Sequence, residues 1–447
     1  MRILQVAHQL PPRFTAGTEV YTLRLAKALT QLGHDVHLVS GDDSGLTRPG
    51  TLRDGSIEGL PHTFVGVDRV AATAEETLFP PATRGVLAPL VATFRPDVIH
   101  VQHLRHLGFH VFDGAPRVRR VMTLHDHWLA CARDGQLLDA RGRPCPGATP
   151  ERCRACLDGF RFGLGRGEAA VARTMSRFGI RSGSFPARWL RSGALALRRL
   201  RSPSTSASYD LEARRAAVGA LAASTDRFIA PSRHVADALT AFGLPAEKMV
   251  VIPHGVDADP GFRAVPAAAG APLRIGYMGT VAPPKGLHVL VAAFSRLGSG
   301  EATLRVHGRT DLRPEYVSSV VGGGLPPGVT IEGAFRPDEA PRRLAEIDVL
   351  VVPSIWPENH PLTITEALAH RVPVVASALG GIPEIVKDGV NGRLVPPGDP
   401  GALAEVLAGL ARDRVELARL RAGITPPESF LSHAASVVVA YDTREVS

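Results

Sequence analysis

The chain has 447 residues, 45% of them hydrophobic and 21% charged, with a formal net charge of +8. This is the composition of a globular protein of about two or three domains, and no segment approaches the roughly 20 apolar residues of a membrane span. The first residues read as a strand that ends at Pro11-Pro12 and not as a signal peptide, so we expect a cytoplasmic protein.

Arginine supplies nearly all of the basic charge. The only lysines are Lys27, Lys248, Lys285 and Lys387. Ten arginines and a single acid, Glu168, lie in the segment 161–201. This segment is either a solvated connector or a basic face held near anionic lipid at the inner side of the membrane, where each basic residue can add about 1 kcal/mol. Nucleic acid is a poorer match and is not expected as a partner, because no aromatic stacking surface accompanies the arginines.

The first half of the chain alternates short apolar strands with helices. A helix is expected over about 18–32, where Leu25 and Leu29 recur near the 3.6-residue period and Gly33 suits a C-terminal cap. The strands of this half are expected at 2–8, 35–40, 97–103, 119–125, 227–232 and 249–255. Residues 130–225 break the alternation and are expected to form an insertion.

A Pro/Ala/Gly-rich stretch at 258–272 has the composition of a linker. After it the alternation restarts with the apolar runs RIGYMG, TLRVHG, VTIEG, VLVVPS, PVVAS and GRLV. Short strands separated by helices predict parallel sheets covered on both faces, hence two doubly wound α/β domains. We expect an N-terminal domain over 1–257, a C-terminal domain over 273–427, and a final helix within 428–447 that packs back on the first domain.

Two carboxylates flank a helix start in the segment WPENHPLTITEALA, which follows an apolar strand. Open α/β sheets hold their ligands at this end of the strands. Pro361 suits the first helical position, and the N–H groups of Leu362 and Thr363 then point outward and can bind a phosphate. Glu366 lies about one turn further in, where its carboxylate can accept hydrogen bonds from the vicinal hydroxyls of a ribose. With Glu358 ahead of the helix, the segment predicts a nucleotide-sugar site.

A lysine opens the first helix of the second half. Lys285 follows Gly279 and Thr280 after a strand. The departure of a nucleoside diphosphate builds negative charge on two phosphates, which a fixed ammonium and a helix dipole stabilise without a metal. Arg309 adds to this charge unless Lys285 supplies it alone. In the N-terminal half, Gly17 joins the first strand to its helix and permits close approach of backbone to ligand.

The order and spacing of several motifs are specific in combination. AGTEVYTLRLAKAL, PDVIHVQH, TLHDHW, FIAPSRHVADAL, VIPHGVD and GYMGTVAPPKG, followed by the two glutamates, resemble retaining glycosyltransferases of family 4, also called group 1. The resemblance implies the GT-B fold, with two Rossmann-like domains facing each other across a cleft. It also implies that Glu358 contacts the hydroxyls of the transferred sugar, that His125 faces this sugar and helps to place it, and that catalysis requires no cofactor. Ala16, Thr280, His360 and Pro361 depart from residues that are usual in the family.

The four cysteines form the least expected feature. Cys131, Cys145, Cys153 and Cys156 are all the cysteines of the chain and fall within one loop-like segment. The last two have the CxxC spacing of a metal knuckle, and four thiolates suit a closed tetrahedral zinc site. In a cytoplasmic enzyme this favours metal or redox use over a structural disulfide. We therefore expect a structural zinc, with disulfide or redox pairing, unrelated free thiols and an iron–sulfur cluster as alternatives. Because the segment follows His125 directly, it should border the acceptor side of the cleft.

These features predict an enzyme that transfers a sugar from a UDP- or GDP-sugar to a saccharide or lipid-linked acceptor in the synthesis of cell-surface polysaccharides or glycoconjugates. The resemblance implies retention of the anomeric configuration. A GT-B phosphorylase or a nucleotide-sugar epimerase is an alternative that uses the same phosphate grip. A catalytically dead, zinc-bearing protein that binds nucleic acid or membrane is a further alternative, and the intact Glu358, Glu366 and Lys285 argue against it.

Overall fold

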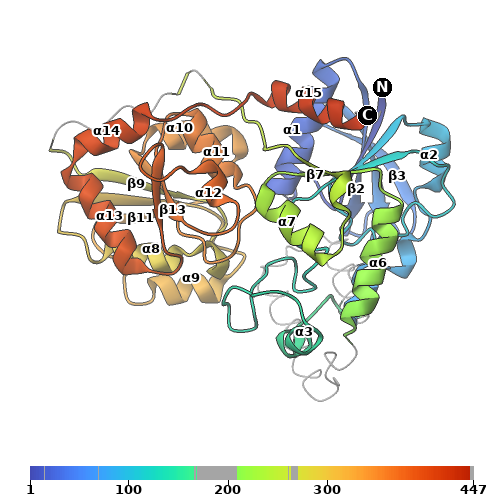
Figure 1. Cartoon of the computed structure of the whole chain (residues 1–447), viewed down its shortest axis with the longest axis horizontal. Helices are drawn as coiled ribbons and strands as arrows, with labels where there is room; N and C mark the ends of the chain where they lie inside the picture. Colours follow the sequence, from blue (N-terminus) through green and yellow to red (C-terminus); the bar gives the residue numbers. More distant parts are fainter. Residues whose placement is uncertain are drawn as a thin grey trace.

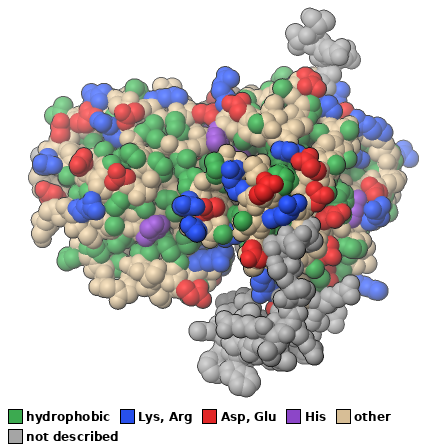
Figure 2. Space-filling model, turned by 60° about the horizontal axis from the view of Figure 1, so that its bottom comes forward, with side chains coloured by type: hydrophobic (Ala, Val, Ile, Leu, Met, Phe, Trp, Pro, Cys, Tyr) green, Lys and Arg blue, Asp and Glu red, His purple; other side chains and the backbone are tan. Residues whose placement is uncertain are grey.

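The computed structural model describes residues 1–442 except 15, 69, 166–167, 169–208, 260 and 263–269. Two α/β domains lie side by side, one built on an eight-stranded sheet and the other on a six-stranded sheet (Figure 1). This is the expected fold class. Within the described ranges, no helix combines the length and the apolar character that crossing a bilayer requires. Nearly all of the Arg-rich segment 161–201 lies outside the described residues, and on the face drawn in Figure 2 basic and acidic side chains are interspersed.

The N-terminal sheet has the strand order β3-β4-β2-β1-β5-β6-β7-β8. Its strands are β1 (Arg2–Ala7), β2 (Asp35–Asp42), β3 (Leu52–Ile57), β4 (Leu60–Gly66), β5 (Val98–Val101), β6 (Arg119–Thr123), β7 (Arg227–Ala230) and β8 (Met249–Val251). All neighbours are parallel except β3 and β4, which form an antiparallel hairpin. Because the chain winds outward in both directions from β1, a crevice opens at the carboxyl ends of the central strands.

The C-terminal sheet is entirely parallel and has the order β11-β10-β9-β12-β13-β14. Its strands are β9 (Leu273–Met278), β10 (Ala302–His307), β11 (Val329–Gly333), β12 (Val349–Val352), β13 (Val374–Ser377) and β14 (Gly392–Val395). Here the winding reverses between β9 and β12, which places a second crevice beyond the ends of these two strands.

Helices cover both faces of both sheets. Those that accompany the N-terminal sheet are α1 (Gly17–Gln31), α2 (Ala88–Phe94), α3 (Pro150–Leu157), α6 (Leu211–Ala223), α7 (Arg233–Phe242) and α15 (Phe430–Tyr441). Those of the C-terminal domain are α8 (Leu287–Phe294), α9 (Pro314–Val321), α10 (Ala340–Ala345), α11 (Leu362–Ala369), α12 (Ile382–Ile385), α13 (Pro400–Arg412) and α14 (Arg414–Ala422). The alternation of strand and helix explains why the central strands are nearly continuous apolar runs, since helices bury them on both sides.

Successive residues of the central strands belong to different cores. Ile3 and Val98 pack with α1 and α15 on one face of the N-terminal sheet, whereas Leu4 and Ile99 pack with α6 and α7 on the other. All four side chains are buried. The side chains of a strand alternate between the faces of its sheet, so two separate layers of helices hold the same strands in place.

The last helix belongs spatially to the first domain. After α14 the chain crosses back, and α15 lies beside α1 (Figure 1). Two buried hydrogen bonds fix it there, from Tyr21 Oη to His433 Nε2 at 2.8 Å and between His100 Nδ1 and Tyr441 Oη at 2.7 Å. The return of the chain ties the two domains together at a second point besides the linker.

Every strand that the sequence predicts is present, most of them at slightly different bounds, and β2 extends beyond the predicted end to Asp42. The β3–β4 hairpin has no counterpart among the predicted strands. Helix α6 also differs from expectation: it lies within 130–225, the predicted insertion, yet Leu211 and Val218 are buried in the domain core and the helix leads directly into β7. Its apolar face makes it a regular crossover helix of the sheet.

Candidate active site

A cavity of about 410 Å³ lies between the two domains, a volume typical of small-molecule sites. One wall is formed by the loop before α1 and the residues after β6, and the other by the ends of β9, β10 and β12 and the start of α11. All of the residues that the sequence predicts for donor binding and catalysis line this one cavity: Gly17, His125, Gly279, Thr280, Lys285, Arg309, Glu358, Leu362, Thr363 and Glu366.

Lys285 and Glu358 form an ion pair in the floor of the cavity. Lys285 Nζ donates to Glu358 Oε1 at 2.7 Å, and the Ser354 hydroxyl donates to the same oxygen at 2.7 Å. The Glu358 side chain is only 6% exposed, whereas that of Lys285 is 33% exposed. The ammonium also lies 5.0 Å from the centre of the Trp356 ring. The carboxylate therefore holds the lysine in place while leaving it within reach of a ligand.

A close contact of backbone with backbone sets the position of Lys285. The next residue, Gly286, has φ 72°, and a Cβ atom there would lie 1.8 Å from the carbonyl oxygen of Pro353 at the end of β12. Only glycine allows both the conformation and the approach. The short turn that ends in Lys285 is thus pressed against the strand that leads to Glu358.

Glu366 makes an ion pair with the N-terminal domain. Arg24 Nη1, from α1 of the N-terminal domain, donates to Glu366 Oε1 at 2.9 Å. The two side chains are 30% and 13% exposed. A carboxylate accepts several hydrogen bonds, so this contact orients Glu366 and leaves capacity for ligand hydroxyls. The sequence analysis did not identify Arg24 as a site residue, because its partner is 342 positions away.

The start of α11 faces the start of α1. Pro361 is the residue before the helix, with ψ 114°, and not its first helical residue as the sequence analysis expected. Leu362 and Thr363 remain the first two helical residues, whose N–H groups have no acceptor within the helix. A Cβ atom on Gly17 would lie 3.9 Å from Leu362 Cδ1, an ordinary contact. The packing of the protein itself therefore does not require glycine at position 17.

His125 is a buried, neutral imidazole. Its Nε2 lies 2.9 Å from the amide oxygen of Gln102, which makes this nitrogen the donor. Burial, with a smaller contribution from the neighbouring His103, lowers the pKa of His125 to about 3. Its ring stacks on that of His254 at 5.7 Å. At neutral pH this residue can exchange hydrogen bonds with a sugar, but it does not carry a positive charge toward a phosphate.

A charged acid, Asp126, lines the same cavity and was not among the predicted site residues. Its Oδ2 lies 3.4 Å from His103 Nε2, and its Oδ1 accepts from the Trp128 N–H at 2.8 Å. Burial alone raises the pKa of Asp126, but His103 and the backbone bond outweigh it and leave the pKa far below its usual value. The signal in the sequence was its position directly after His125 at a strand end.

Arg309 lines the cavity beyond Gly279 and Thr280, although it is engaged elsewhere. Its Nε and Nη2 donate to the two carboxylate oxygens of Asp311 at 3.0 and 2.7 Å, and the pair is exposed. A phosphate contact would require Arg309 to leave Asp311. By position, Lys285 is the cation of the cavity that is better placed for a ligand.

Polar contacts from the C-terminal domain hold the two domains together beside the cavity. Asn359 Nδ2 donates to the Leu124 carbonyl at 2.8 Å, and the Ser232 hydroxyl donates to Asn359 Oδ1 at 2.6 Å. Glu384 accepts from the N–H groups of Arg233 and His234, both at 2.8 Å, at the start of α7. A carboxylate at a helix N-terminus accepts hydrogen bonds from unpaired N–H groups and interacts favourably with the positive end of the helix dipole.

Two family models match the chain, and together they span most of it. Residues 272–413 match the model described as "Glycosyl transferases group 1". Residues 15–151 and 187–260 match "Glycosyltransferase Family 4". The chain belongs to the family 4 glycosyltransferases.

Curated relatives of this family member are glycosyltransferases. The chain is 32% identical over 188 residues to "Amylovoran biosynthesis glycosyltransferase AmsK" of Erwinia amylovora, which covers 40% of the chain and 46% of that protein. It is 36% identical over 219 residues to a "D-inositol 3-phosphate glycosyltransferase" of Xylanimonas cellulosilytica, covering 45% of the chain and 52% of that protein. The chain thus spans about half the length of the curated relatives it matches.

Solved structures of similar architecture span nearly the whole chain. Sucrose-phosphate synthase from Thermosynechococcus elongatus matches with a TM-score of 0.66 at 19% identity, and Anabaena Alr3699/HepE in complex with UDP and glucose with a TM-score of 0.64 at 19% identity. Both matches cover 98% of each chain. They establish the two-domain GT-B fold of this family 4 chain.

The four cysteines of this family member lie in the segment that leaves the cavity after His125. None forms a disulfide, and each is partly buried. Burial, together with the other three thiols, raises the pKa of the Cys153 thiol to about 11. Across the described residues, no group of three or more His, Cys, Asp or Glu side chains is arranged to hold a metal ion. The expected zinc site therefore stays a prediction.

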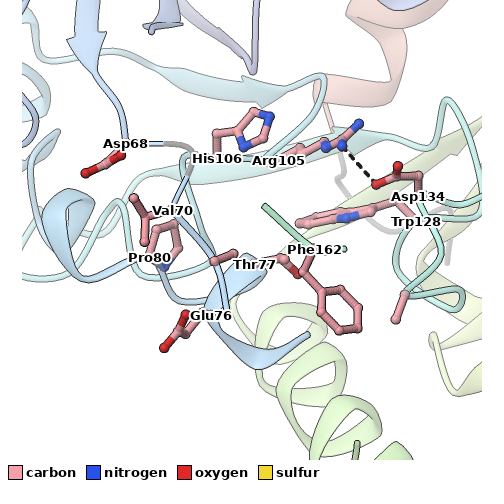
Figure 3. Close-up of a pocket in the computed structure, with 12 residues that line it drawn as sticks. Asp68, Val70, Glu76, Thr77, Pro80, Arg105, His106, Trp128, Asp134 and Phe162 are labelled. Carbon is pink, nitrogen blue, oxygen red and sulfur yellow. Dashed lines mark ion pairs between the residues drawn. The ribbon is translucent and has the colours of Figure 1, made fainter. Parts of the chain in front are cut away.

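A second, smaller hollow lies in the N-terminal domain (Figure 3). Arg105 and Asp134 form an ion pair of 2.8 Å at its edge, and Trp128 and Phe162 contribute aromatic side chains. Its free volume is about 20 Å³, which is room for one or two water molecules and not for a sugar ring. The larger interdomain cavity is therefore the candidate substrate site.

Proposed function

We propose that this protein transfers a sugar from a nucleoside-diphosphate sugar to a saccharide or lipid-linked acceptor, with retention of the anomeric configuration. The observation that carries the proposal is that Lys285, Glu358 and Glu366 line a single cavity large enough for a nucleotide-sugar. Family membership and the names of the curated relatives support the reaction class and a role in polysaccharide or glycoconjugate synthesis.

The C-terminal domain grips the donor. Glu366 accepts hydrogen bonds from the ribose hydroxyls while Arg24 holds its carboxylate in position. The N–H groups of Leu362 and Thr363 at the start of α11 bind a phosphate with the aid of the helix dipole. Glu358, fixed by Lys285 and Ser354, contacts hydroxyls of the transferred sugar. UDP-glucose is the first donor to test, because Anabaena HepE was solved with it, and GDP-sugars come next.

Lys285 assists the chemical step. As the bond between the anomeric carbon and the diphosphate oxygen breaks, its electron pair and the negative charge move to the diphosphate. An ammonium already fixed beside the phosphates stabilises this charge without reorganisation. The acceptor hydroxyl attacks the anomeric carbon, and its proton passes to the departing diphosphate oxygen. No protein carboxylate is assigned as a covalent nucleophile. The reaction as proposed needs no cofactor.

The N-terminal domain supplies the acceptor side. His125, neutral and hydrogen-bonded to Gln102, offers a hydrogen-bonding group to the donor sugar, and the ionised Asp126 lies beside it. The contacts of Asn359 and Glu384 with the N-terminal domain hold the cavity closed and limit the entry of water that would hydrolyse the donor. For a lipid-linked acceptor, the Arg-rich segment 161–201 would approach the anionic surface that carries it.

The proposal is tested with a panel of nucleotide-sugars. Thermal-shift screening identifies the donor, and NMR of the product formed with a saccharide acceptor reports the anomeric configuration. We expect binding of one class of nucleoside-diphosphate sugar, its loss in Glu366→Gln, and a product with the configuration of the donor. An inverted product would contradict retention. Conversion of the donor to an epimer without acceptor would instead indicate an epimerase.

A further inference from the structure

We propose that Cys131, Cys145, Cys153 and Cys156 together bind one structural zinc ion. The site would tie three separate parts of the segment between β6 and α6 to one another. It lies outside the sugar-transfer cavity and goes beyond the proposed function. The inference rests on how the chain brings the thiols together and on a buried positive charge beside them.

The local fold gathers all four cysteines of the chain into one region. Cys153 and Cys156 lie three positions apart in α3, so their side chains share a face of the helix. Cys145 lies at the end of a small hairpin closed by the bridge between Leu138 and Pro144, and its N–H donates to the Leu137 carbonyl at 2.7 Å. The three segments that carry the thiols therefore have defined positions relative to one another.

A cysteine sulfur of α3 contacts the hairpin. Cys156 Sγ lies 3.7 Å from the carbonyl oxygen of Leu138 in the hairpin, and Cys145 Sγ lies 3.5 Å from that of Gly147. Cys131, Cys145 and Cys156 each lie within electrostatic reach of Cys153. All four thiols are free, and those of Cys145 and Cys156 donate to these carbonyls. No three of these thiols are placed around a common point in the described structure, so zinc binding requires the side chains to leave these weak contacts and turn toward one another.

A buried guanidinium beside the thiols is the second, independent observation. Arg214 in α6 is only 3% exposed. Its Nε donates to the Leu129 carbonyl at 3.0 Å and its Nη2 to that of Trp128, whereas its Nη1 has no hydrogen-bond partner in the described structure. A buried charge without a counter-charge is costly, so a partner of opposite sign is expected nearby.

The described groups whose charge acts on Arg214 are Tyr209, Cys131 and Cys153, and none of them is a carboxylate. Cysteine binds zinc as the thiolate, so four cysteines around a divalent ion carry a net charge of −2. A second guanidinium, that of Arg133, donates to the Cys156 carbonyl at 3.0 Å. Zinc tetrathiolate would thus supply the negative charge that the buried Arg214 lacks.

The four thiolate ligands favour zinc over other metal ions. Four thiolates with no oxygen or water ligand suit a tetrahedral, redox-inactive zinc held for structure. The spacing, with 13, 7 and 2 residues between successive cysteines, allows all four to ligate one ion only if the hairpin folds over α3. The contact of Cys156 with Leu138 places the hairpin against α3.

The direct test is the metal content of the full-length protein purified without chelator or added metal. We expect about one zinc per chain by inductively coupled plasma mass spectrometry. Replacement by Co²⁺ should give the thiolate-to-cobalt charge-transfer and tetrahedral d–d absorption bands. In Cys145→Ser and Cys156→Ser these bands should weaken and shift. Zinc affinity, measured by competition with a chromophoric chelator, should fall by more than the roughly 10–100-fold typical of losing a residue that only supports a ligand.

Glu151→Gln is the matched control, because this exposed residue lies in α3 and its change leaves every thiol intact. It should bind zinc and cobalt like the wild type. The metal content and the cobalt spectrum of the wild type test the proposal even where a cysteine variant fails to fold. Wild-type protein that contains no metal and takes up none when reduced would overturn the proposal. So would disulfides detected by mass under non-reducing conditions, or iron with visible absorption.

Discussion

Lys285 has two proposed roles: it stabilises the fold through its ion pair with Glu358, and it assists sugar transfer. Replacing Lys285 by methionine should therefore affect both stability and rate. The variant leaves a carboxylate that is only 6% exposed, and among the described residues Ser354 remains as its side-chain donor. A hydrogen bond to a charged group contributes about 1.5–3 kcal/mol, so the free energy of unfolding of Lys285→Met should fall by about that amount. Sugar transfer should slow by about 10²–10³-fold, because the charge on the departing diphosphate loses its ammonium.

The double variant Lys285→Met/Glu358→Gln provides the decisive comparison. Glutamine removes the buried unpaired charge, so the double variant should regain most of the lost stability, to within about 1 kcal/mol of the wild type. Its rate should remain as low as that of Lys285→Met or lower. Urea unfolding followed by tryptophan fluorescence gives the stability, and initial rates with the identified donor give the activity. If activity returned together with stability, Lys285 would act only on folding and the reasoning would be refuted.

Three further predictions follow from the contacts around the cavity. Burial lowers the pKa of His125 to about 3 and that of His360 to about 4, against 6.5 in the unfolded chain. Below pH 6.5 the unfolded chain therefore binds more protons than the folded chain does. Between pH 6.5 and about 4, each of the two histidines should lower the free energy of unfolding by up to about 1.4 kcal/mol per pH unit. A urea midpoint that does not change from pH 7 to pH 5 would contradict this. Arg24→Gln should weaken UDP binding about two- to tenfold in a calorimetric titration because Glu366 loses its orienting partner, whereas Arg24→Lys should stay closer to the wild type. Glu384→Ala removes two hydrogen bonds at the start of α7, so it should destabilise the protein by about 1 kcal/mol. It should also increase the radius of gyration in small-angle scattering. An unchanged radius would show that this contact does not hold the domains together.

The central strands of both sheets could be predicted from the sequence alone. Runs such as Val349–Val352 and Val374–Ser377 are buried on both faces, and continuous β-branched runs signal such burial directly. The hairpin β3–β4 carried no such signal, because β3 is an edge strand with the polar sequence LRDGSI. Its turn at Glu58-Gly59, where both residues have positive φ, is the feature that predicts it.

The site was predictable where its residues follow strand ends, and not where they meet across the domains. Lys285, Glu358 and Glu366 lie next to apolar strands, so the rule that ligands bind at carboxyl ends located them. Arg24 lies on a regular helix and becomes a site residue only because the two domains bring it to Glu366. Such a pairing depends on the tertiary arrangement and leaves no local pattern in the sequence.

The most direct test of the central claim is a calorimetric titration of UDP, uridine and pyrophosphate into three proteins: the wild type, Lys285→Met and Glu366→Gln. If the donor panel selects a GDP-sugar, GDP replaces UDP and guanosine replaces uridine. One bound donor with its ribose at Glu366 and its diphosphate at Lys285 predicts a matched pattern. Glu366→Gln should weaken the nucleoside and the nucleoside diphosphate but not pyrophosphate. Lys285→Met should weaken pyrophosphate and the nucleoside diphosphate but not the nucleoside. If both variants bound all three ligands like the wild type, these two residues would not share a donor site.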